Sequence, residues 1–288
     1  MKCKLTTGLI AAGAAALACL AAQADTSVAA WTYSSSGISD GKGHSLAVEW
    51  TEGSSELTVD VCSPSGDIDL WNLTVNGTPI TSLKFANGAF ENSSLTGFRA
   101  NHVAGNLYGT FNRCTNLKSV EIAGDGVKKL GYTGSIYSTR YGPFYGCASL
   151  VDVKFDCPNL LTIDSYAFYK CSSLVSIEIP ASVTTINSSA FDECGKLASV
   201  KFPEGLQTID RYAFGDCKSL TDLDIPDGVQ SIYYSAFWGL ASGTQAKCTS
   251  LTKDGFSDFP ISTRRQRRMS SFPRVCVISA TGPFMEKK

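Results

Sequence analysis

Hydrophobic residues recur at fixed intervals in the second half of the chain. Phe168, Phe191, Phe214 and Phe237 follow one another at intervals of 23 residues. Between them the same order of positions returns: Ala-Phe, then Cys, then Leu, then two apolar residues separated by one residue, then Pro. A structural unit of this length cannot bury its apolar side alone, whereas stacked copies can. The pattern therefore predicts a repeat solenoid.

One copy of the repeat predicts a short strand followed by a turn. Ile177 and Ile179 are two residues apart, which places both on one face of a strand. Pro180 follows and cannot donate a ladder hydrogen bond, so the strand should end there. In the next copy Cys194 and Leu197 follow Phe191 at intervals of three, a spacing that suits a single helical or 3₁₀ turn.

The full phrase, A-F-x-x-C-x-x-L-x-x-I-x-I-P-x-x-V-x-x-I, resembles the BspA-type leucine-rich repeat family. Repeats of roughly 20–29 residues with an L-x-x-L-x-L core are typical of leucine-rich repeat solenoids. The resemblance is specific from about Phe144 to Phe237 and looser from about Leu70. It implies parallel strands joined by short helical or 3₁₀ turns. It also implies an exported or surface protein that binds other proteins or host matrix. We expect no cofactor.

We expect four segments along the 288 residues. Residues 1–24 read as a cleaved signal peptide, because Lys2 and Lys4 precede an Ala- and Leu-rich core and an A-x-A site. Lipidation at Cys19 is the alternative for this segment. Residues 25–66 alternate apolar and polar positions and predict an N-terminal β cap. Residues 67–240 form the solenoid, and residues 241–288 an atypical basic tail.

The solenoid should contain about seven repeats, of which the first two are degenerate. We read Leu70-x-x-Leu73-x-Val75 and Leu95-x-x-Phe98-x-Ala100 as their strands. An insertion at residues 131–143 lengthens the interval from Phe111 to Phe144. Insertions in repeat proteins map to loops on one face, often a binding face.

Nine cysteines remain after the signal peptide, and five of them occupy one repeat position. An exported protein invites a disulfide interpretation. Free cysteine, however, behaves as a small buried hydrophobe, which favours a ladder of buried thiols. Zinc is not supported, since no C-x-x-C pair is present and the chain has 2 histidines. The five equivalent residues are Cys114, Cys147, Cys171, Cys194 and Cys217.

Two candidate surfaces for a protein partner emerge. The first consists of the solvent-facing positions of successive strands, Glu121, Lys154, Glu178, Lys201 and Asp224, whose charges alternate. It could equally be a plain solvated sheet face. The second is the insertion, with Tyr132, Tyr137, Arg140 and Tyr141, residue types that adaptable binding loops use. It could equally be a harmless surface loop.

The charge and hydropathy of the chain argue against nucleic-acid binding and against a membrane span. The formal net charge is −1, and the alternating strand charges create no single-sign field that would steer nucleic acid. The basic run at 264–268 reads as a solvated tail rather than a nucleic-acid site. No transmembrane span is expected in the mature chain, since no later apolar run reaches about 18 residues.

The sequence predicts a non-catalytic binding or adhesion protein at the cell surface. No catalytic motif is present, so we assign no catalytic, cofactor or metal residues. A passive structural surface component is the main alternative, and a cryptic carbohydrate-active enzyme the second. The aromatic residues of the cap, Trp31, Tyr33 and Trp50, read as core packing, with a sugar-stacking platform as the alternative.

Overall fold

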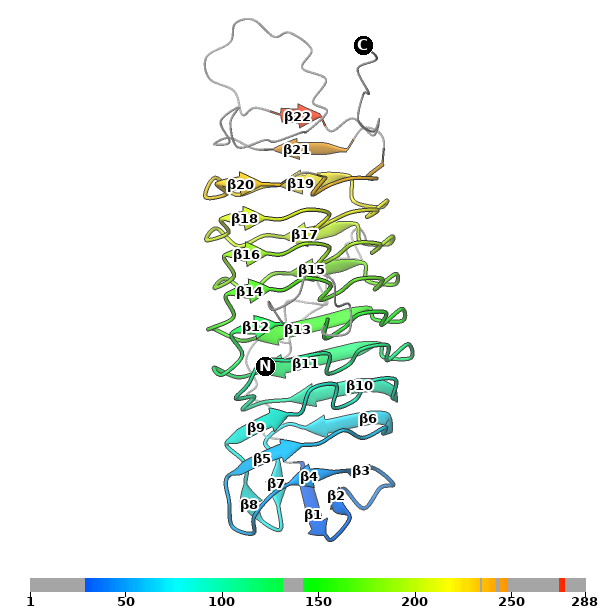
Figure 1. Ribbon diagram of the computed structural model, residues 1–288, viewed down its shortest axis with the longest axis vertical. Coiled ribbons are helices and arrows are strands. Elements are labelled where there is room, and N and C mark those ends of the chain that lie inside the picture. Colours follow the sequence, from blue (N-terminus) through cyan, green and yellow to red (C-terminus); the bar gives the residue numbers. More distant parts are fainter. Residues whose placement is uncertain (1–28, 132–141, 234, 242–243, 248–274, 278–288) are drawn as a thin grey trace, which may run out of the picture.

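The computed structural model describes residues 29–131, 142–233, 235–241, 244–247 and 275–277. These residues build a β-solenoid with parallel strands, preceded by mixed sheets at the N-terminal end (Figure 1). The strands are β1 (Ala30–Ser34), β2 (Gly37–Ser39), β3 (Ser45–Leu46), β4 (Val48–Glu49), β5 (Glu56–Val59), β6 (Ser65–Leu70), β7 (Thr74–Val75), β8 (Thr78–Pro79), β9 (Ser82–Phe85), β10 (Ser94–Ala100), β11 (Ser119–Ala123), β12 (Lys129–Leu130), β13 (Asp152–Asp156), β14 (Thr162–Ile163), β15 (Ser176–Glu178), β16 (Thr185–Ile186), β17 (Ser199–Lys201), β18 (Thr208–Ile209), β19 (Asp222–Asp224), β20 (Ser231–Ile232), β21 (Gln245–Lys247) and β22 (Val275–Val277).

Each repeat, or rung, contributes one strand to each of two faces of the stack (Figure 1). On the first face β6, β10, β11 and β13 pair in parallel, and β15 with β17 and β19 with β21 continue the stack. On the second face β12, β14, β16, β18 and β20 pair in parallel. Equivalent residues of neighbouring rungs lie opposite each other, as Ile177 does to Val200 and Ile186 to Ile209. The 23-residue period therefore translates directly into spatial register.

The connecting turn contains no helix within the described ranges. Consecutive i to i+3 hydrogen bonds are present, since the Cys171 amide donates to the Phe168 carbonyl and the Leu174 amide to the Cys171 carbonyl, both at 3.1 Å. Tyr166 and Lys170, two positions before and after Phe168, both have left-handed backbone conformations, with φ near 61°. The positions equivalent to Lys170 in the neighbouring rungs, Gly146 and Glu193, are also left-handed, and they interrupt the 3₁₀ geometry there. The predicted helical turn is thus built as a series of separate tight turns.

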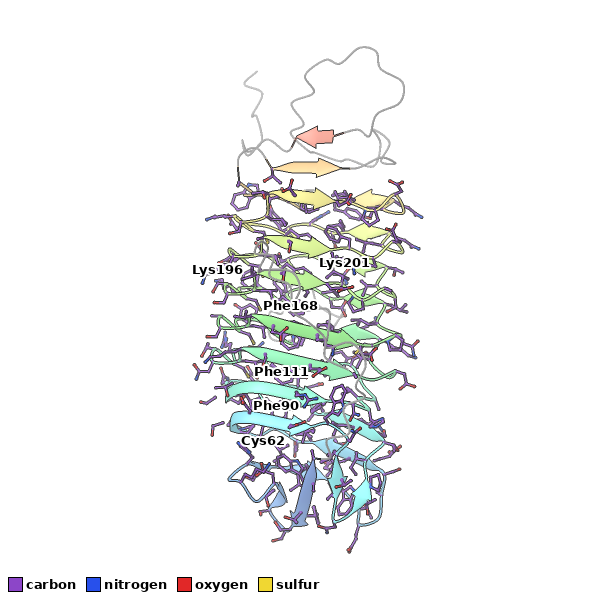
Figure 2. The ribbon with its side chains drawn as sticks, turned by 180° about the vertical axis from the view of Figure 1, so that it is seen from behind. Cys62, Phe90, Phe111, Phe168, Lys196 and Lys201 are labelled. Atoms are coloured by element: carbon purple, nitrogen blue, oxygen red, sulfur yellow. The ribbon has the colours of Figure 1, made fainter. Side chains whose placement is uncertain are left out.

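A column of phenylalanine rings fills the core. Phe168 stacks on Phe144 and Phe191, with ring centroids 5.0 and 4.9 Å apart. Figure 2 shows Phe90, Phe111 and Phe168 along one line through the molecule. Burial of each ring removes a large apolar surface from water, which contributes about 1.5–3 kcal/mol per side chain. The column runs through Phe90, Phe111, Phe144, Phe168, Phe191, Phe214 and Phe237, all buried.

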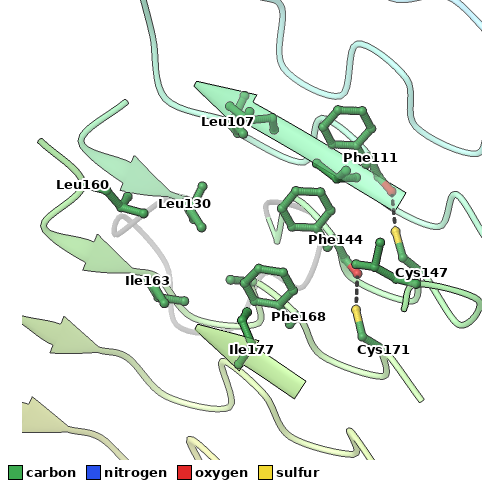
Figure 3. Packing of buried hydrophobic residues seen from close by; sticks show 14 of the residues in the cluster. Leu107, Phe111, Leu130, Phe144, Cys147, Leu160, Ile163, Phe168, Cys171 and Ile177 are labelled. Atoms are coloured by element: carbon green, nitrogen blue, oxygen red, sulfur yellow. Dashed lines mark hydrogen bonds between the residues drawn. The ribbon is translucent and has the colours of Figure 1, made fainter. Parts of the chain in front are cut away.

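The repeat cysteines form a second column beside the rings. Each thiol is free and buried. Each also donates to the carbonyl of a phenylalanine in the preceding rung, as Cys147 does to Phe111 at 3.0 Å and Cys171 to Phe144 at 3.1 Å (Figure 3). Burial raises the pKa of these thiols well above the ordinary range. The structure thus contains the predicted column of buried, unbridged cysteines at the five repeat positions.

The insertion leaves this stacking unbroken. Phe111 and Phe144 are 33 residues apart, yet their rings stack at 5.3 Å with planes 5° apart. On the second face Leu130 of β12 lies opposite Ile163 of β14, as in any regular rung. Residues 132–141 lie outside the described part of the chain.

The predicted first rung was placed in the wrong register. We expected Leu70, Leu73 and Val75 to share one strand, but Ile68 and Leu70 of β6 lie opposite Phe98 and Ala100 of β10. The cause is local: Asn76 and Gly77 both have positive φ, which makes them a two-residue hairpin turn between β7 and β8. Val75 consequently pairs with β1 in the N-terminal sheet.

Asp164 carries the one ionisable acidic or basic side chain among the buried polar residues of the described part of the chain. Asp164 follows β14 and has no exposed surface. Its Oδ1 accepts a hydrogen bond from Asn187 at 2.7 Å, whereas its Oδ2 has no partner. Burial raises the pKa of Asp164 to about 6, against the Asn187 hydrogen bond and the Lys129 charge, which both lower it. The ionised side chain therefore destabilises the fold at neutral pH.

We expect Phe191→Ala to lower the unfolding free energy by about 3–5 kcal/mol, because it opens a cavity between two stacked rings. Urea denaturation followed by far-ultraviolet circular dichroism measures the change. Leu161→Ala is the control, since Leu161 is 50% exposed and should change stability by less than about 1 kcal/mol. Equal effects of the two substitutions would show that Phe191 is not in the column.

We expect Asp164→Asn to stabilise the protein at pH 7.5 by about 1–3 kcal/mol, because it removes a buried charge. The pKa of Asp164 is higher in the folded protein than its ordinary value of 3.8, so the wild-type protein loses stability as the pH rises from about 4 to about 6. The difference between variant and wild type should therefore shrink below pH 4. Asp210→Asn, at the equivalent position two rungs on, is the control. A stabilisation that did not depend on pH would contradict this account.

Candidate partner-binding surface

The outward positions of the first strand face form a continuous column of charges. Parallel in-register pairing places Arg99 opposite both Asp69 and Glu121, and Glu121 opposite Lys154. Farther along, Glu178 lies opposite Lys201. We call this set the charged column; it comprises Asp69, Arg99, Glu121, Lys154, Glu178, Lys201 and Asp224.

At the N-terminal end of the charged column the side chains form one network. The Arg99 guanidinium lies 3.3 Å from Asp69 Oδ2 and 3.1 Å from Glu121 Oε2, and Lys154 Nζ lies 2.6 Å from Glu121 Oε1. Partial burial acts to raise the pKa of Glu121, but the hydrogen bonds and charges of Lys154 and Arg99 outweigh it and lower the pKa. Arg99 also lies over the Trp71 ring, 5.0 Å from its centroid. This end of the column is therefore fixed in place.

In the middle of the charged column, the side chains of Glu178 and Lys201 are more exposed to solvent than those of Arg99 and Glu121. Lys201 Nζ lies 2.5 Å from Glu178 Oε1, and these side chains are 73% and 69% exposed. Exposed pairs of this kind contribute only about 0–1 kcal/mol to stability. Their charges are consequently available to a partner at small cost to the fold.

A second column on the same face carries short polar side chains. Ser176 and Ser199 lie opposite each other on β15 and β17, and Asp152 lies opposite Ser119. With Asp222 on β19 these residues are all exposed. They provide both donors and acceptors along the face.

Exposed apolar side chains border these polar columns. Val151 and Val175 occupy the same position of successive rungs, each one residue before its strand, and are 50% and 47% exposed. Ala198 follows at the equivalent position and is also exposed. The strand face therefore combines apolar area with directional polar groups, which is the composition of interface centres and rims.

The structure places the two sets of predicted site residues differently. Glu121, Lys154, Glu178, Lys201 and Asp224 share the strand face in the predicted register. The insertion residues Tyr132, Tyr137, Arg140 and Tyr141 lie outside the described residues. They remain a predicted site.

Sequence reasoning missed two members of the charged column and its apolar border. Arg99 stood in a recognised repeat at the position equivalent to Glu121, so the signal was present. Asp69 was missed because the first rung was read in the wrong register. The position of Val151 and Val175 holds different residue types in successive repeats. Only the exposed area of these two side chains distinguishes them from core residues.

The described residues hold no group of three or more histidine, cysteine, aspartate or glutamate side chains that could bind a metal ion. Among the same residues no helix is long and apolar enough to cross a membrane.

Comparison with known proteins supports the repeat assignment. Residues 125–244 match the BspA type leucine rich repeat region, in six copies. No curated protein matches the sequence. Residues 125–244 thus carry repeats of the BspA type, the resemblance that the sequence pattern indicates.

Solved structures share the fold. A leucine rich cell surface protein from Faecalibacterium prausnitzii superposes with a TM-score of 0.52 at 23% identity, covering 73% of this chain and 54% of that one. A leucine-rich repeat protein from Bacteroides ovatus gives a TM-score of 0.50 at 19% identity, covering 68% and 56%. The chain therefore spans little more than half the length of these relatives.

We expect the combined variant Lys154→Ala, Glu178→Ala, Lys201→Ala to lose less than about 1 kcal/mol of unfolding free energy, because these side chains are mostly exposed. Arg99→Ala should cost more, about 1–2 kcal/mol, since it removes two ion pairs and a cation–π contact. Thermal melts of both variants at low salt provide the comparison. A triple variant as unstable as Arg99→Ala would mean that the accessible charges serve the fold rather than a partner.

Proposed function

We propose that this protein is an exported, non-catalytic binding protein of the bacterial cell surface, and that its strand face contacts a protein partner. The observation that carries the proposal is the pairing of exposed Val151 and Val175 with adjacent charged and hydroxyl columns. Single exposed apolar residues are common on protein surfaces, whereas Val151 and Val175 occupy the same position of successive rungs beside accessible charges.

The repeat type and the structural relatives support the proposed location at the bacterial cell surface. The matching repeats are of the BspA type, and one structural relative is described as a cell surface protein. Export rests on the predicted signal peptide at residues 1–24. The insertion, with Tyr132, Tyr137, Arg140 and Tyr141, is a second proposed contact region on the same protein.

A cryptic carbohydrate-active enzyme is the weaker candidate. Its only support is the fold, and one fold can host many functions. Nothing in the strand face pairs an acid with a base around an enclosed site, as glycoside hydrolysis needs. We assign the strand face to binding alone.

The charges of the face would orient a partner rather than supply most of the affinity. Complementary charges raise association rates and select register, while desolvated apolar contacts dominate binding energy. Val151 and Val175 are therefore the expected centre of the contact, and Lys154, Glu178 and Lys201 its rim.

The test begins with affinity capture from host-cell and neighbouring-cell surface extracts, followed by purification of the captured partner. Val151→Ser with Val175→Ser should weaken binding of the pure partner at least tenfold. The triple variant of Lys154, Glu178 and Lys201 should slow association and reduce its salt dependence. Leu161→Ser is the matched control, because Leu161 is also 50% exposed but precedes β14 on the second face.

A separate variant, Tyr132→Ser with Tyr137→Ser and Tyr141→Ser, tests the insertion. Loss of binding in this variant alone would move the contact to the insertion and refute the strand face. Capture of no partner would favour the passive structural role. Equal binding by all variants would refute both the strand face and the insertion as contact regions.

A further inference from the structure

A polar groove lies on the N-terminal sheets, away from the strand face. Its volume is about 470 Å³, and it is lined by Tyr33, Val48, Glu49, Trp50, Thr51, Ser54, Glu56 and Thr58. Sites for small ligands commonly enclose about 300–1,000 Å³. Tyr33 belongs to β1, and the other lining residues belong to β4, to β5 or to the connection between these two strands. The three strands lie together at that end of the molecule (Figure 1).

The hairpin of β4 and β5 presents polar side chains on its outer face. Glu49 lies opposite Thr58 in the antiparallel register. Glu56 shares a face with Thr58 because it is two residues away, and Leu57 and Val59 between and beyond them are buried. The groove thus has carboxylate acceptors and hydroxyl groups at neighbouring positions.

An aromatic pair forms the apolar part of the groove. Tyr33 packs edge-on against Trp50, with ring centroids 5.1 Å apart and planes at 64°. Trp50 is buried and its Nε1 donates to the Ser54 carbonyl at 2.8 Å, so it serves as a fixed support. Tyr33 remains 39% exposed. Trp31, two residues earlier on β1, is buried, so of the two only Tyr33 offers its ring to the groove.

The charged residues in and beside the groove disfavour anionic ligands and attract cationic ligands only weakly. No basic residue lines it, and Glu49 and Glu56 would repel an anion. Glu56 is partly neutralised by Lys84, whose Nζ lies 3.5 Å from Glu56 Oε2. This pairing weakens the field that would otherwise attract a cation. Hydroxyl groups and an exposed ring beside carboxylate acceptors suit a ligand rich in hydroxyl donors with an apolar ring face.

We infer that this groove binds a short neutral oligosaccharide. A sugar ring packs its C–H face on Tyr33, and its hydroxyl groups donate to Glu49 and exchange hydrogen bonds with Thr51 and Thr58. The site is independent of the strand face, so the protein can bind a glycan and a protein partner separately.

The test is titration of the full chain with four neutral trisaccharides: maltotriose, cellotriose, laminaritriose and tri-N-acetylchitotriose. Calorimetry or ligand-observed NMR should detect saturable binding of at least one. Tyr33→Ala should weaken it more than tenfold. Tyr233→Ala, which removes a tyrosine of similar exposure (44%) from the solenoid, should leave it unchanged.

Glu49→Gln keeps the test valid if Tyr33→Ala unfolds, and it should weaken binding severalfold, because an amide is a poorer acceptor than a carboxylate. Trilysine and sialyllactose are the charged comparison ligands. The inference is overturned if no neutral trisaccharide binds, if binding survives both substitutions, or if trilysine binds in preference to every sugar.

Discussion

The stacking of each rung on an identical neighbour is the interaction on which the rest of the structure depends. A single repeat has too little apolar surface to fold alone, so the buried surface of Phe191 exists only because Phe168 and Phe214 cover its two faces. The thiol of Cys194 follows the same rule, since it donates to the Phe168 carbonyl of the preceding rung. Matching core positions in neighbouring rungs are thus a physical requirement, and the regular spacing of these positions along the chain reflects it.

The same register constrains the outer surface. Parallel strands in register bring equivalent outward side chains close together, so a column of like charges would repel itself along its whole length. Alternation of Glu121, Lys154, Glu178 and Lys201 relieves this repulsion, while all of these side chains except that of Glu121 stay mostly exposed. Charged side chains can therefore fill an exposed face while the net field stays small. That arrangement suits recognition of a partner by position and shape more than attraction of a polyanion.

The parts of this fold that could be predicted are those governed by the period. The phenylalanine and cysteine columns and the five charged positions from Glu121 to Asp224 follow from the order of positions within the repeat, which the insertion before Phe144 leaves unchanged. The first rung was misread because an Asn76-Gly77 turn overrode an apparently suitable apolar spacing, and Asp69 was lost with it. The exposure of Val151 and Tyr33 could not be predicted, because their neighbours Leu150 and Trp31 are equally apolar and buried. Burial here depends on the turn geometry and not on residue type.

A regular solenoid offers a partner no unique binding position, since every rung has nearly the same surface. Specific binding must therefore use positions where successive rungs differ. The position just before the first-face strand is such a place: it runs from Lys118 through Val151 and Val175 to Ala198 and Thr221, all exposed. Its apolar part is confined to the middle rungs, where the charged side chains Glu178 and Lys201 are also most accessible. The exposed apolar residues and the most accessible charges thus lie on the same rungs. These rungs differ from the rest of the strand face, which is what the proposed partner contact requires.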